Sequence, residues 1–215
     1  MRAIIFANGR MESWPEKFDL FPDADVIIAA DGGLKHCTRK RLVPHLVIGG
    51  MDSADPDELA ALEERGVEVK RYSIRKDETD LWLAVRAALD RKVDEIIILG
   101  ALGGRWDMTF SNVLVLTSPE LKETETRILD GNQELFVLQG GQAARLFGEK
   151  GALLSLMPLT AMVRGVTLKG FEYSLDDATL DLGTTRGISN VFVEDECSIK
   201  LSRGKLLVTV THSDG

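Results

Sequence analysis

Five aspartates stand where a predicted strand ends or a predicted helix begins: Asp31, Asp52, Asp77, Asp80 and Asp107. Asp31 directly follows an apolar run and precedes two glycines, a position where an acid has no obvious structural duty. The turns at the carboxyl edge of a parallel sheet lie together, so carboxylates distant in sequence can converge there. Mg²⁺ is usually held by one or two carboxylates together with substrate phosphates. The acidic set therefore predicts a site for a metal-bound polyphosphate.

Several of these aspartates also have a purely structural explanation. Asp77 and Asp80 can act as amino-terminal helix acids, which is the better explanation when each is taken in isolation. Asp52 can cap the turn at Ser53. From the residues alone, both explanations stay open.

The glycine-rich stretch after residue 99 offers a second group of chemically useful side chains. Residues 96–99 form an apolar run, which predicts a strand buried on both faces. Three glycines then permit backbone conformations closed to other residues: Gly100, Gly103 and Gly104. A helical pattern resumes at about Thr109, so Arg105 and Asp107 are predicted on the intervening turn. A guanidinium can grip phosphate and a carboxylate can hold a metal, but a solvated ion pair on a turn explains the two residues equally well.

The composition excludes several classes of function. The net charge is −8 and no basic block exists to neutralise a phosphate backbone, so no nucleic-acid partner is expected. No run approaches the ~18 apolar residues of a membrane span. The two cysteines, Cys37 and Cys197, lie far apart and have no metal-ligand spacing, which favours a reducing cytoplasm.

Common catalytic motifs are also missing. The sequence has neither a Walker-type phosphate loop nor a dinucleotide fingerprint. The three histidines, His36, His45 and His212, fall at no ligand spacing, and each is predicted to be a surface or turn residue.

The elements that must position these residues are strands and helices in alternation. Apolar runs predict strands at 3–7, 26–30, 46–48, 67–72 and 96–99. Three helices are predicted. The first covers residues 56–65, the second opens at residue 76, and the third ends at residue 116. This alternation predicts an α/β fold, a doubly wound and mostly parallel sheet over residues 1–130.

The pattern changes after residue 131, where short apolar runs are separated by glycines and no helical stripe appears. Many short strands at close spacing predict a small all-β sandwich over residues 131–215. Residues 118–132 are polar and charged, and are predicted to be the crossing between the two domains.

Seven motifs, in order along nearly the whole chain, resemble the thiamine pyrophosphokinase family. Four lie in the first half: Asp31-Gly32-Gly33, Gly49-Gly50-Met51-Asp52-Ser53, Lys76-Asp77-Glu78-Thr79-Asp80, and Gly103-Gly104-Arg105-Trp106-Asp107-Met108 with Asn112 downstream. Three lie in the second half: Ser155-Leu156-Met157-Pro158-Leu159, Leu168-Lys169-Gly170-Phe171-Glu172-Tyr173 and Gly187-Ile188-Ser189-Asn190.

The resemblance implies a reaction and a division of labour. The hydroxyl of thiamine would attack the β-phosphorus of ATP, so that AMP leaves and thiamine diphosphate forms. Residues 1–130 would bind ATP and metal, and residues 131–215 would bind thiamine. Family members are homodimers whose site lies at the subunit interface, so a homodimer is expected.

The resemblance also assigns roles to residues. Four aspartates would hold Mg²⁺: Asp31, Asp52, Asp77 and Asp80. The catalytic set would be Asp52, Asp77, Asp80, Arg105 and Asp107, with Arg105 steadying charge on the phosphoryl oxygens. The nucleotide would lie against Asp31, Gly32, Gly33, Gly103, Gly104 and Asn112. Thiamine would be received by Ser189 and Asn190.

Two positions depart from the family pattern. Gly50 stands where the family has the first aspartate of an Asp-x-Asp pair, and Met108 stands where it has histidine. These departures bear on catalytic efficiency and on substrate choice. Two alternatives therefore stay open, namely a pyrophosphokinase for another hydroxymethyl heterocycle such as a pterin, and a thiamine-binding protein that has lost turnover.

Overall fold

The computed structural model describes residues 1–16, 18, 20 and 26–213. Residues 17, 19, 21–25, 214 and 215, which fall within the two predicted domains, lie outside the described part. The chain divides into two compact units, Met1–Gly131 and Asn132–Gly215. Each unit encloses a hydrophobic core of its own.

The first unit is built on a parallel sheet. Its strands are β1 (Arg2–Phe6), β2 (Val26–Ala30), β3 (Leu46–Gly49), β4 (Glu68–Arg71), β5 (Glu95–Leu99) and β6 (Glu125–Asp130). They pair in the order β6-β5-β1-β2-β3-β4, and every pairing is parallel. The chain therefore runs outward from β1 to β4 and returns to β5 on the other side of β1. That reversal creates a topological switch point between β1 and β5, where sheets of this kind bind ligands.

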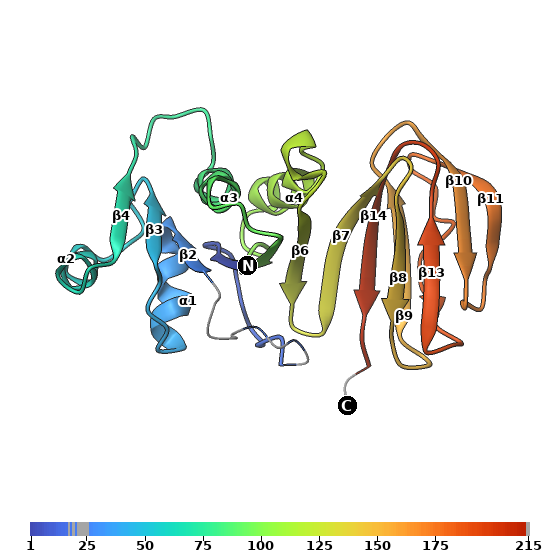
Figure 1. Cartoon of the computed structure of the whole chain (residues 1–215), viewed down its shortest axis with the longest axis horizontal. Coiled ribbons are helices and arrows are strands. Elements are labelled where there is room, and N and C mark those ends of the chain that lie inside the picture. The colour runs from blue at the N-terminus through green and yellow to red at the C-terminus, as the bar shows by residue number, and fades with distance from the viewer. Residues whose placement is uncertain (17, 19, 21–25, 214–215) are drawn as a thin grey trace. The chain divides into compact units, whose positions relative to one another are not determined.

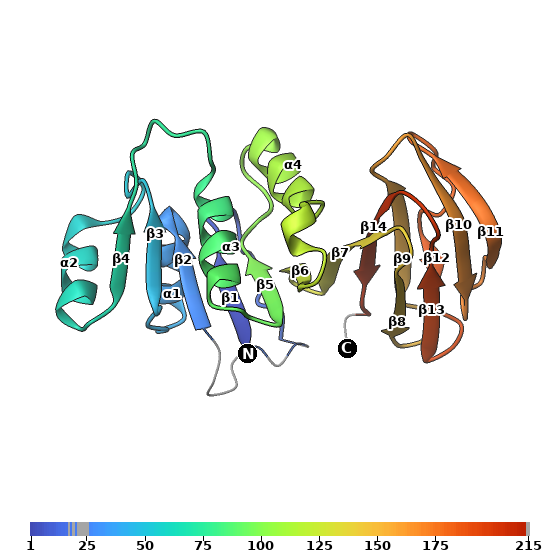
Figure 2. The same ribbon diagram turned by 45° about the horizontal axis from the view of Figure 1, so that its top comes forward.

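Helices cover both faces of this sheet, which confirms the predicted doubly wound α/β fold. Helices α1 (Leu34–Arg39) and α2 (Pro56–Glu64) bury Leu34 and Leu59 in the same core as alternate strand residues such as Ile4 and Phe6. Helix α3 (Asp80–Asp90) packs against β1, β2 and β3. Figures 1 and 2 show α3 and α4 (Trp106–Val115) on one face of the sheet and α1 on the other.

Helix α3 begins at Asp80, four residues after the predicted start. The side chain of Thr79 accepts a hydrogen bond from the backbone N–H of Trp82 at 3.2 Å, so Thr79 is the N-cap. Asp80 in the first turn adds a favourable charge at the positive end of the helix. The apolar stripe of α3 is buried: Leu81, Ala84, Val85 and Ala88.

Two predictions for the first unit are wrong, and one segment contains helices that were not predicted. Residues 118–132 are not a simple crossing, because they contain the short helix η2 (Pro119–Leu121) and strand β6 of the sheet. The segment after β2 contains η1 (Asp31–Gly33) and α1, which apolar periodicity did not indicate. Helix α4 begins at Trp106 rather than near Thr109, so Asp107 lies in its first turn.

The second unit is a pair of antiparallel sheets, which confirms the predicted all-β architecture. Within this unit the strands pair in the orders β12-β9-β14-β7 and β11-β10-β13-β8. The strands are β7 (Gln133–Gln139), β8 (Ala143–Phe147), β9 (Leu153–Pro158), β10 (Met162–Lys169), β11 (Leu175–Asp181), β12 (Asn190–Val191), β13 (Glu196–Lys200) and β14 (Lys205–Thr211). Phe171 and Phe192 meet edge to face in its core, with ring centroids 4.8 Å apart.

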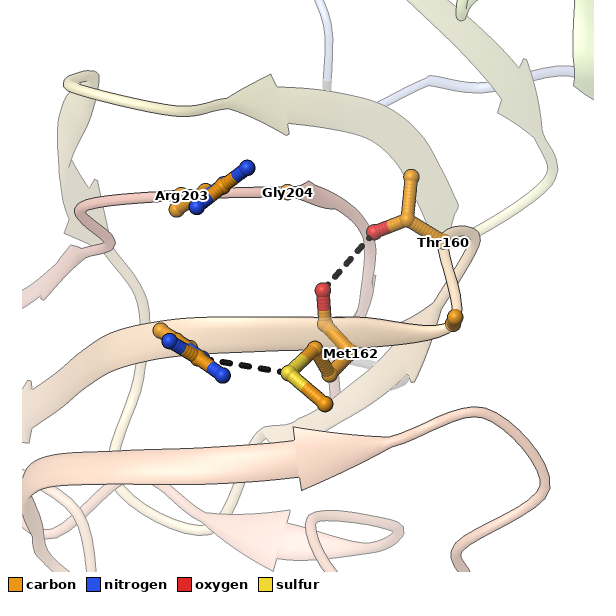
Figure 3. Close-up of a pocket in the computed structure, with 6 residues that line it drawn as sticks. Thr160, Met162, Arg203 and Gly204 are labelled. Carbon is orange, nitrogen blue, oxygen red and sulfur yellow. Dashed lines mark hydrogen bonds between the residues drawn. The ribbon is translucent and has the colours of Figure 1, made fainter.

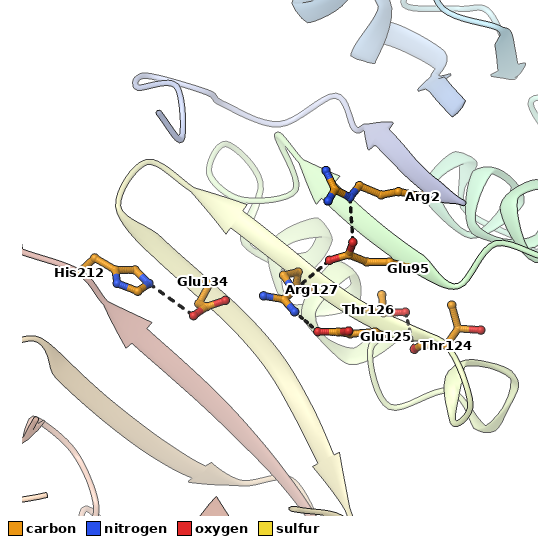
Figure 4. Close-up of polar contacts among 8 residues, drawn as sticks. All are labelled: Arg2, Glu95, Thr124, Glu125, Thr126, Arg127, Glu134 and His212. Atoms are coloured by element: carbon orange, nitrogen blue, oxygen red, sulfur yellow. Dashed lines mark hydrogen bonds and ion pairs between the residues drawn. The ribbon is translucent and has the colours of Figure 1, made fainter. Parts of the chain in front are cut away.

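Each unit contains partly buried ion pairs between residues on or next to its strands (Figure 4). In the first unit Glu95 pairs with Arg2 at 2.8 Å and with Arg127 at 3.7 Å, which ties β1, β5 and β6 together. In the second unit Nε2 of His212 lies 3.4 Å from Glu134 on β7. Among the described helices, none has both the length and the apolar character needed to cross a membrane.

Candidate active site

Three of the predicted acids gather around the turn that follows β3. Gly49 has φ +149°, and an added Cβ there would lie 2.9 Å from the Asp80 carboxylate and 3.0 Å from the Asp31 Cβ. A Cβ on the next residue, Gly50, would lie 2.8 Å from Oδ1 of Asp52. The structure therefore places Asp31 and Asp80 against the turn that follows β3, and Asp52 lies within that turn.

Asp80 connects the start of α3 to this turn. Its Oδ1 accepts a hydrogen bond from the backbone N–H of Gly50 at 3.1 Å. The same oxygen lies 2.9 Å from the ammonium nitrogen of Lys76, and both side chains are largely shielded from solvent. Lys76 also donates to the carbonyl of Ser73 at 3.2 Å. Asp80 is therefore more than a helix acid, because it organises the backbone of the β3 turn.

Asp31 is buried at the end of β2 and is only 5% exposed. Its Oδ1 accepts a hydrogen bond from the backbone N–H of Ser53 at 3.3 Å. Asp31 and Met51 both have positive φ, +45° and +61°. Strained non-glycine residues of this kind cluster at functional sites. Asp31 thus fixes the turn at Ser53, a capping task that the sequence had suggested for Asp52.

Gly32 and Gly33 are required by close packing. An added Cβ would lie 2.5 Å from the Asn8 side chain at Gly32 and 2.0 Å from the Phe6 carbonyl at Gly33. Both glycines are buried, so they hold the end of β2 against the end of β1. The nucleotide-binding role expected of them is untested.

A second lysine stands beside this pair of strand ends. Nζ of Lys35 donates to the backbone carbonyl of Asn8 at 3.0 Å and to its side-chain oxygen at 2.7 Å. Burial and the nearby Arg39 lower the pKa of Lys35, while Asp31 acts in the opposite direction. Lys35 therefore places positive charge near Asp31, as Lys76 does near Asp80.

The switch point itself is closed by backbone hydrogen bonds. Gly9 N–H donates to the carbonyl of Gly100 at 2.7 Å. Beneath this contact His36 is 2% exposed, and its Nε2 donates to the Gly9 carbonyl at 3.0 Å. The prediction that His36 is a surface or turn residue is wrong, because α1 carries it into the core. Burial lowers the pKa of His36, which keeps it neutral.

Asn112 lies on the buried side of α4, next to the same switch point. Its amide nitrogen donates to the carbonyl of Ala101 at 2.7 Å, and the residue is 5% exposed. Among the described residues, neither Oδ1 of Asn112 nor Nδ1 of His36 has a hydrogen-bond partner, although both atoms are buried. The amide of Asn112 therefore ties α4 to the loop that follows β5.

Arg105 and Asp107 pair with each other at the exposed start of α4. Nε of Arg105 donates to Asp107 at 3.1 Å, and a second guanidinium nitrogen contacts the other carboxylate oxygen. This hydrogen bond raises the pKa of Arg105 and lowers the pKa of Asp107. Among the described residues, no hydrogen bond or ion pair joins either side chain to the acids around Gly50. The preceding loop residues Gly103 and Gly104 have φ +77° and +78°.

The remaining predicted residues lie elsewhere. Asp77 is exposed. Ser189 and Asn190 belong to the second unit. Ser189 is exposed with φ +57°, whereas Asn190 is buried and exchanges hydrogen bonds with the backbone of Tyr173 at 3.0 and 2.7 Å. Asn190 therefore shapes the segment that presents Ser189.

The acids suit a hard cation that a substrate helps to hold. In the described part of the chain, no three His, Cys, Asp or Glu side chains are arranged as a complete metal site. Mg²⁺ does not need such a cage, because phosphate oxygens and water complete its shell. The carboxylates of Asp31, Asp52 and Asp80 are the donor type that Mg²⁺ prefers, so the residues present fit this ion.

Sequence reasoning gave no role to Lys35, Asn8 or the buried His36. Lys76 stood within a quoted motif, but it was not proposed as a site residue. The useful signals were the Asn8-Gly9 pair directly after β1 and the lysine four residues before Asp80.

Comparisons with known proteins cover both units. Residues 19–129 match the family model for the thiamin pyrophosphokinase catalytic domain, and residues 144–206 match the model for its vitamin B1 binding domain. The thiamine pyrophosphokinase of Bacillus subtilis (strain 168) is 26% identical over 204 residues, which cover 95% of this chain and 95% of that protein.

Solved structures share the fold over the full length. The crystal structure of the Bacillus subtilis thiamine pyrophosphokinase has a TM-score of 0.88 at 24% identity, and it covers 99% of this chain and 100% of its own. The thiamin pyrophosphokinase of Geobacillus thermodenitrificans has a TM-score of 0.86 at 23% identity, with coverage of 100% and 99%.

Proposed function

The chain belongs to the thiamine pyrophosphokinase family, and from this premise we propose that it is a working thiamine diphosphokinase with ATP as the co-substrate. The observation that carries the proposal is the gathering of Asp31, Asp52 and Asp80 around the turn after β3. This turn lies within the residues that match the catalytic-domain model. Of the alternatives, neither a pterin substrate nor a loss of turnover finds support in the matched family models.

The proposed reaction transfers a diphosphoryl group in one step. The hydroxyl oxygen of thiamine forms a bond to the β-phosphorus of ATP, and the bond from that phosphorus to the bridging oxygen of the α-phosphate breaks. The hydroxyl proton is lost, and AMP leaves with the bridging oxygen. Catalysis of such a transfer rests on positioning and on electrostatic stabilisation rather than on covalent chemistry by the protein.

Asp31, Asp52 and Asp80 would hold Mg²⁺ on the triphosphate. When bound, the ion would neutralise charge on the phosphate oxygens and orient the chain of phosphates. Lys76, whose Nζ lies 2.9 Å from Oδ1 of Asp80, keeps that carboxylate directed at the Gly50 amide, which is 3.1 Å away. Asp77, which is exposed, would contribute only if the segment before α3 rearranges around the nucleotide.

Arg105 is proposed to bind the phosphoryl oxygens that gain charge. Its guanidinium is held by Asp107 in a two-pronged contact, and a phosphate offers the same pairing geometry with greater charge. Gly103 and Gly104, with positive φ, let the loop before α4 approach a ligand closely. Lys35 and the amide of Asn112 would complete the nucleotide side of the site.

The thiamine side is assigned to the second unit. Ser189 offers an exposed hydroxyl at a strained backbone position. The backbone N–H of Ser189 donates to Oγ of Ser155 at 3.1 Å, which ties two of the family-like motifs together. Asn190 acts as a positioning residue, because its amide is engaged by Tyr173 and by the N–H of Val191.

We propose that the protein is a homodimer formed through α4. Of the ten residues of this helix only Asn112 is buried. Trp106, Phe110 and Leu114, spaced by four residues, are 76%, 64% and 51% exposed. Spacing of this kind makes one apolar stripe, and a stripe of large exposed apolar residues marks an interaction surface. A second copy of the chain is the occupant, as in the family to which it belongs.

A cytoplasmic location remains a proposal as well. It is supported by the two cysteines, which are free and buried. Burial raises the pKa of the Cys37 thiol to about 12, so this thiol is unreactive.

A direct assay tests the proposed activity. Purified protein is incubated with ATP, Mg²⁺ and either thiamine or a hydroxymethylpterin, and AMP and diphosphorylated products are measured. AMP should form with thiamine only. AMP formed only with the pterin would favour the pterin alternative, and tight thiamine binding without any product would favour the binding-protein alternative.

A matched pair of variants tests the acidic set. Asp52→Asn should lower kcat by about a hundredfold, the usual cost of losing one group that stabilises transition-state charge, while the KM for thiamine changes little. Asp57→Asn, at an exposed acid in α2, serves as the control and should keep full activity. A wild-type kcat in Asp52→Asn at saturating Mg²⁺ would remove Asp52 from the catalytic residues.

A further inference from the structure

The second unit contains an open hollow of about 340 Å³ that has no part in the proposed reaction (Figure 3). It lies between the turn that joins β9 to β10 and the turn that precedes β14. The lining residues are Thr160, Ala161, Met162, Arg164, Arg203 and Gly204.

Two arginines in this hollow stand directly opposite each other. Arg164 and Arg203 form an isolated antiparallel bridge. The N–H of Arg164 donates to the Arg203 carbonyl at 2.9 Å, and the N–H of Arg203 donates back at 3.2 Å. Directly opposed residues project on the same side of a strand pair, and like charges in that arrangement repel. The two guanidiniums therefore concentrate positive charge in one place.

Neither guanidinium is neutralised by an acid within the described residues. The side chain of Arg164 contacts the sulfur of Met162 at 3.1 Å, and the side chain of Arg203 has no hydrogen bond or ion pair there. The sequence has 34 acids against 26 lysines and arginines, so carboxylates are abundant. The other exposed arginine of the same sheet, Arg145, does pair with Glu196 at 3.4 Å. Within the described residues, the absence of an acidic partner is therefore specific to Arg164 and Arg203 and does not reflect a general shortage of acids.

The walls of the hollow are held in place by a separate set of hydrogen bonds. The hydroxyl of Thr160 donates to the Met162 carbonyl at 3.1 Å and accepts from the N–H of Lys205 at 3.1 Å. Gly204 has φ +100°, and a Cβ there would lie 2.8 Å from both the Met162 carbonyl and the Thr160 hydroxyl. The backbone is thus fixed by close contacts, whereas the two guanidiniums are left for another partner.

We propose that Arg164 and Arg203 form a binding site for the phosphate group of a small molecule. Two guanidiniums offer paired N–H donors that match phosphate oxygens, and their two charges match a phosphate dianion better than a single carboxylate. The hollow has room for a phosphate with a small organic group attached. This site is built from second-unit residues alone and does not rest on the proposed kinase activity.

Phosphate titration at constant ionic strength tests the site, because ionic strength alone changes exposed charge interactions. Amide chemical shifts in ¹⁵N-labelled protein give a local readout at Thr160 and Gly204, which line the hollow. Inorganic phosphate, AMP and thiamine diphosphate are compared, with acetate as the monoanionic reference. We expect saturable shifts at both amides with all three phosphates.

Variants separate the arginine pair from general charge effects. Arg164→Gln and Arg203→Gln should each weaken phosphate binding by at least about tenfold, since a hydrogen bond to a charged group contributes more than one tenfold step. Arg203→Lys keeps the charge but loses the planar fork, and should bind with intermediate affinity. Arg145→Gln is the control and should bind phosphate as the wild type does.

The stability of the same variants gives an independent readout. A ligand that binds only the folded state raises Tm, so phosphate should raise the Tm of the wild type and of Arg145→Gln but not of the double variant Arg164→Gln/Arg203→Gln. In phosphate-free buffer, Arg203→Gln should fold with a Tm no lower than wild type because a repulsion is removed. Unchanged phosphate affinity in the folded double variant, or equal affinity for acetate, would overturn the proposal.

Discussion

Gly50 is one of the two positions at which the chain departs from the family pattern. It lies in the turn proposed to hold the metal. Its φ is outside the positive region, so its backbone does not require glycine. An added Cβ would lie 2.8 Å from the exposed Asp52 carboxylate, which can turn away, and 3.6 Å from Nζ of Lys76. Gly49 is different, because φ +149° and contacts with Asp80 and Asp31 exclude a side chain. Position 50 can therefore accept the aspartate that the family has there.

Gly50→Asp should bind Mg²⁺ more tightly than the wild type. We expect the Mg²⁺ concentration for half-maximal rate to fall by about tenfold, a typical effect of one group close to a metal. Gly50→Ala is the control, since it adds the Cβ without the carboxylate and should leave the Mg²⁺ midpoint unchanged. Titration of Mg²⁺ in all three proteins decides the matter, and an unchanged midpoint in folded Gly50→Asp would mean that Gly50 does not mark a lost ligand.

Arg105 tests the phosphate side of the site at the same scale. Lysine keeps the charge but cannot form the two-pronged contact, so Arg105→Lys should lose at least about tenfold in kcat. Stopped assays with saturating ATP measure the effect, and Arg86→Lys, at an exposed arginine of α3 that pairs with Glu78, is the control. Full activity in Arg105→Lys would make Arg105 a surface cation that pairs only with Asp107.

At the scale of elements, the sequence predicted those with strong periodicity and missed those without it. Strand β2 has the predicted bounds, and α3 lies within the helix that is predicted from residue 76 onward. Helix α1 has only six residues and its sequence shows no repeat, so its burial of His36 depends on tertiary packing. Strand β6 reads as a polar linker because only Ile128 and Leu129 are buried in it. Strands β8 and β13 have only five residues each, and β8 shows no alternation of polar and apolar residues.

Helix α4 carries the prediction about assembly. Phe110→Glu puts a charge in the middle of the exposed stripe, so it should convert the dimer into a monomer. If the active site is shared between subunits, activity should fall at the same time. Sedimentation equilibrium measures the mass. Phe147→Glu, at a 67% exposed phenylalanine of β8, is the control and should remain dimeric. A monomeric wild type with full activity would contradict the proposed interface.

Helix α1 carries a prediction about pH. Burial lowers the pKa of His36 in the folded state below the ordinary value of 6.5. The unfolded state then binds more protons between the two pKa values, so the free energy of unfolding falls as pH drops below about 6.5. His36→Gln keeps a donor for the Gly9 carbonyl and removes this titration. Urea unfolding between pH 7 and pH 5 should show a shallower pH dependence in His36→Gln, and equal slopes would contradict a buried neutral His36.

At the scale of the whole molecule, the sequence indicated two parts because its periodicity changes after β6. The convergence of Asp31, Asp52 and Asp80 was also predictable, because they follow or precede neighbouring elements of one sheet edge. The pairing of Asp80 with Lys76 and of Asp31 with Ser53 was not, because it depends on the path of the β3 turn. The arginine pair at 164 and 203 was invisible to motif reasoning, since only strand register brings these residues together.

The central claim concerns the whole enzyme, namely that both outer phosphoryl groups of ATP pass to thiamine together. Isotopic labelling tests it most directly: the protein is given thiamine and Mg²⁺ with either [α-³²P]ATP or [γ-³²P]ATP, and the products are separated. The account predicts that the α label appears only in AMP and the γ label only in thiamine diphosphate. Release of ADP together with a γ label in thiamine monophosphate or inorganic phosphate would contradict the transfer of a diphosphoryl group.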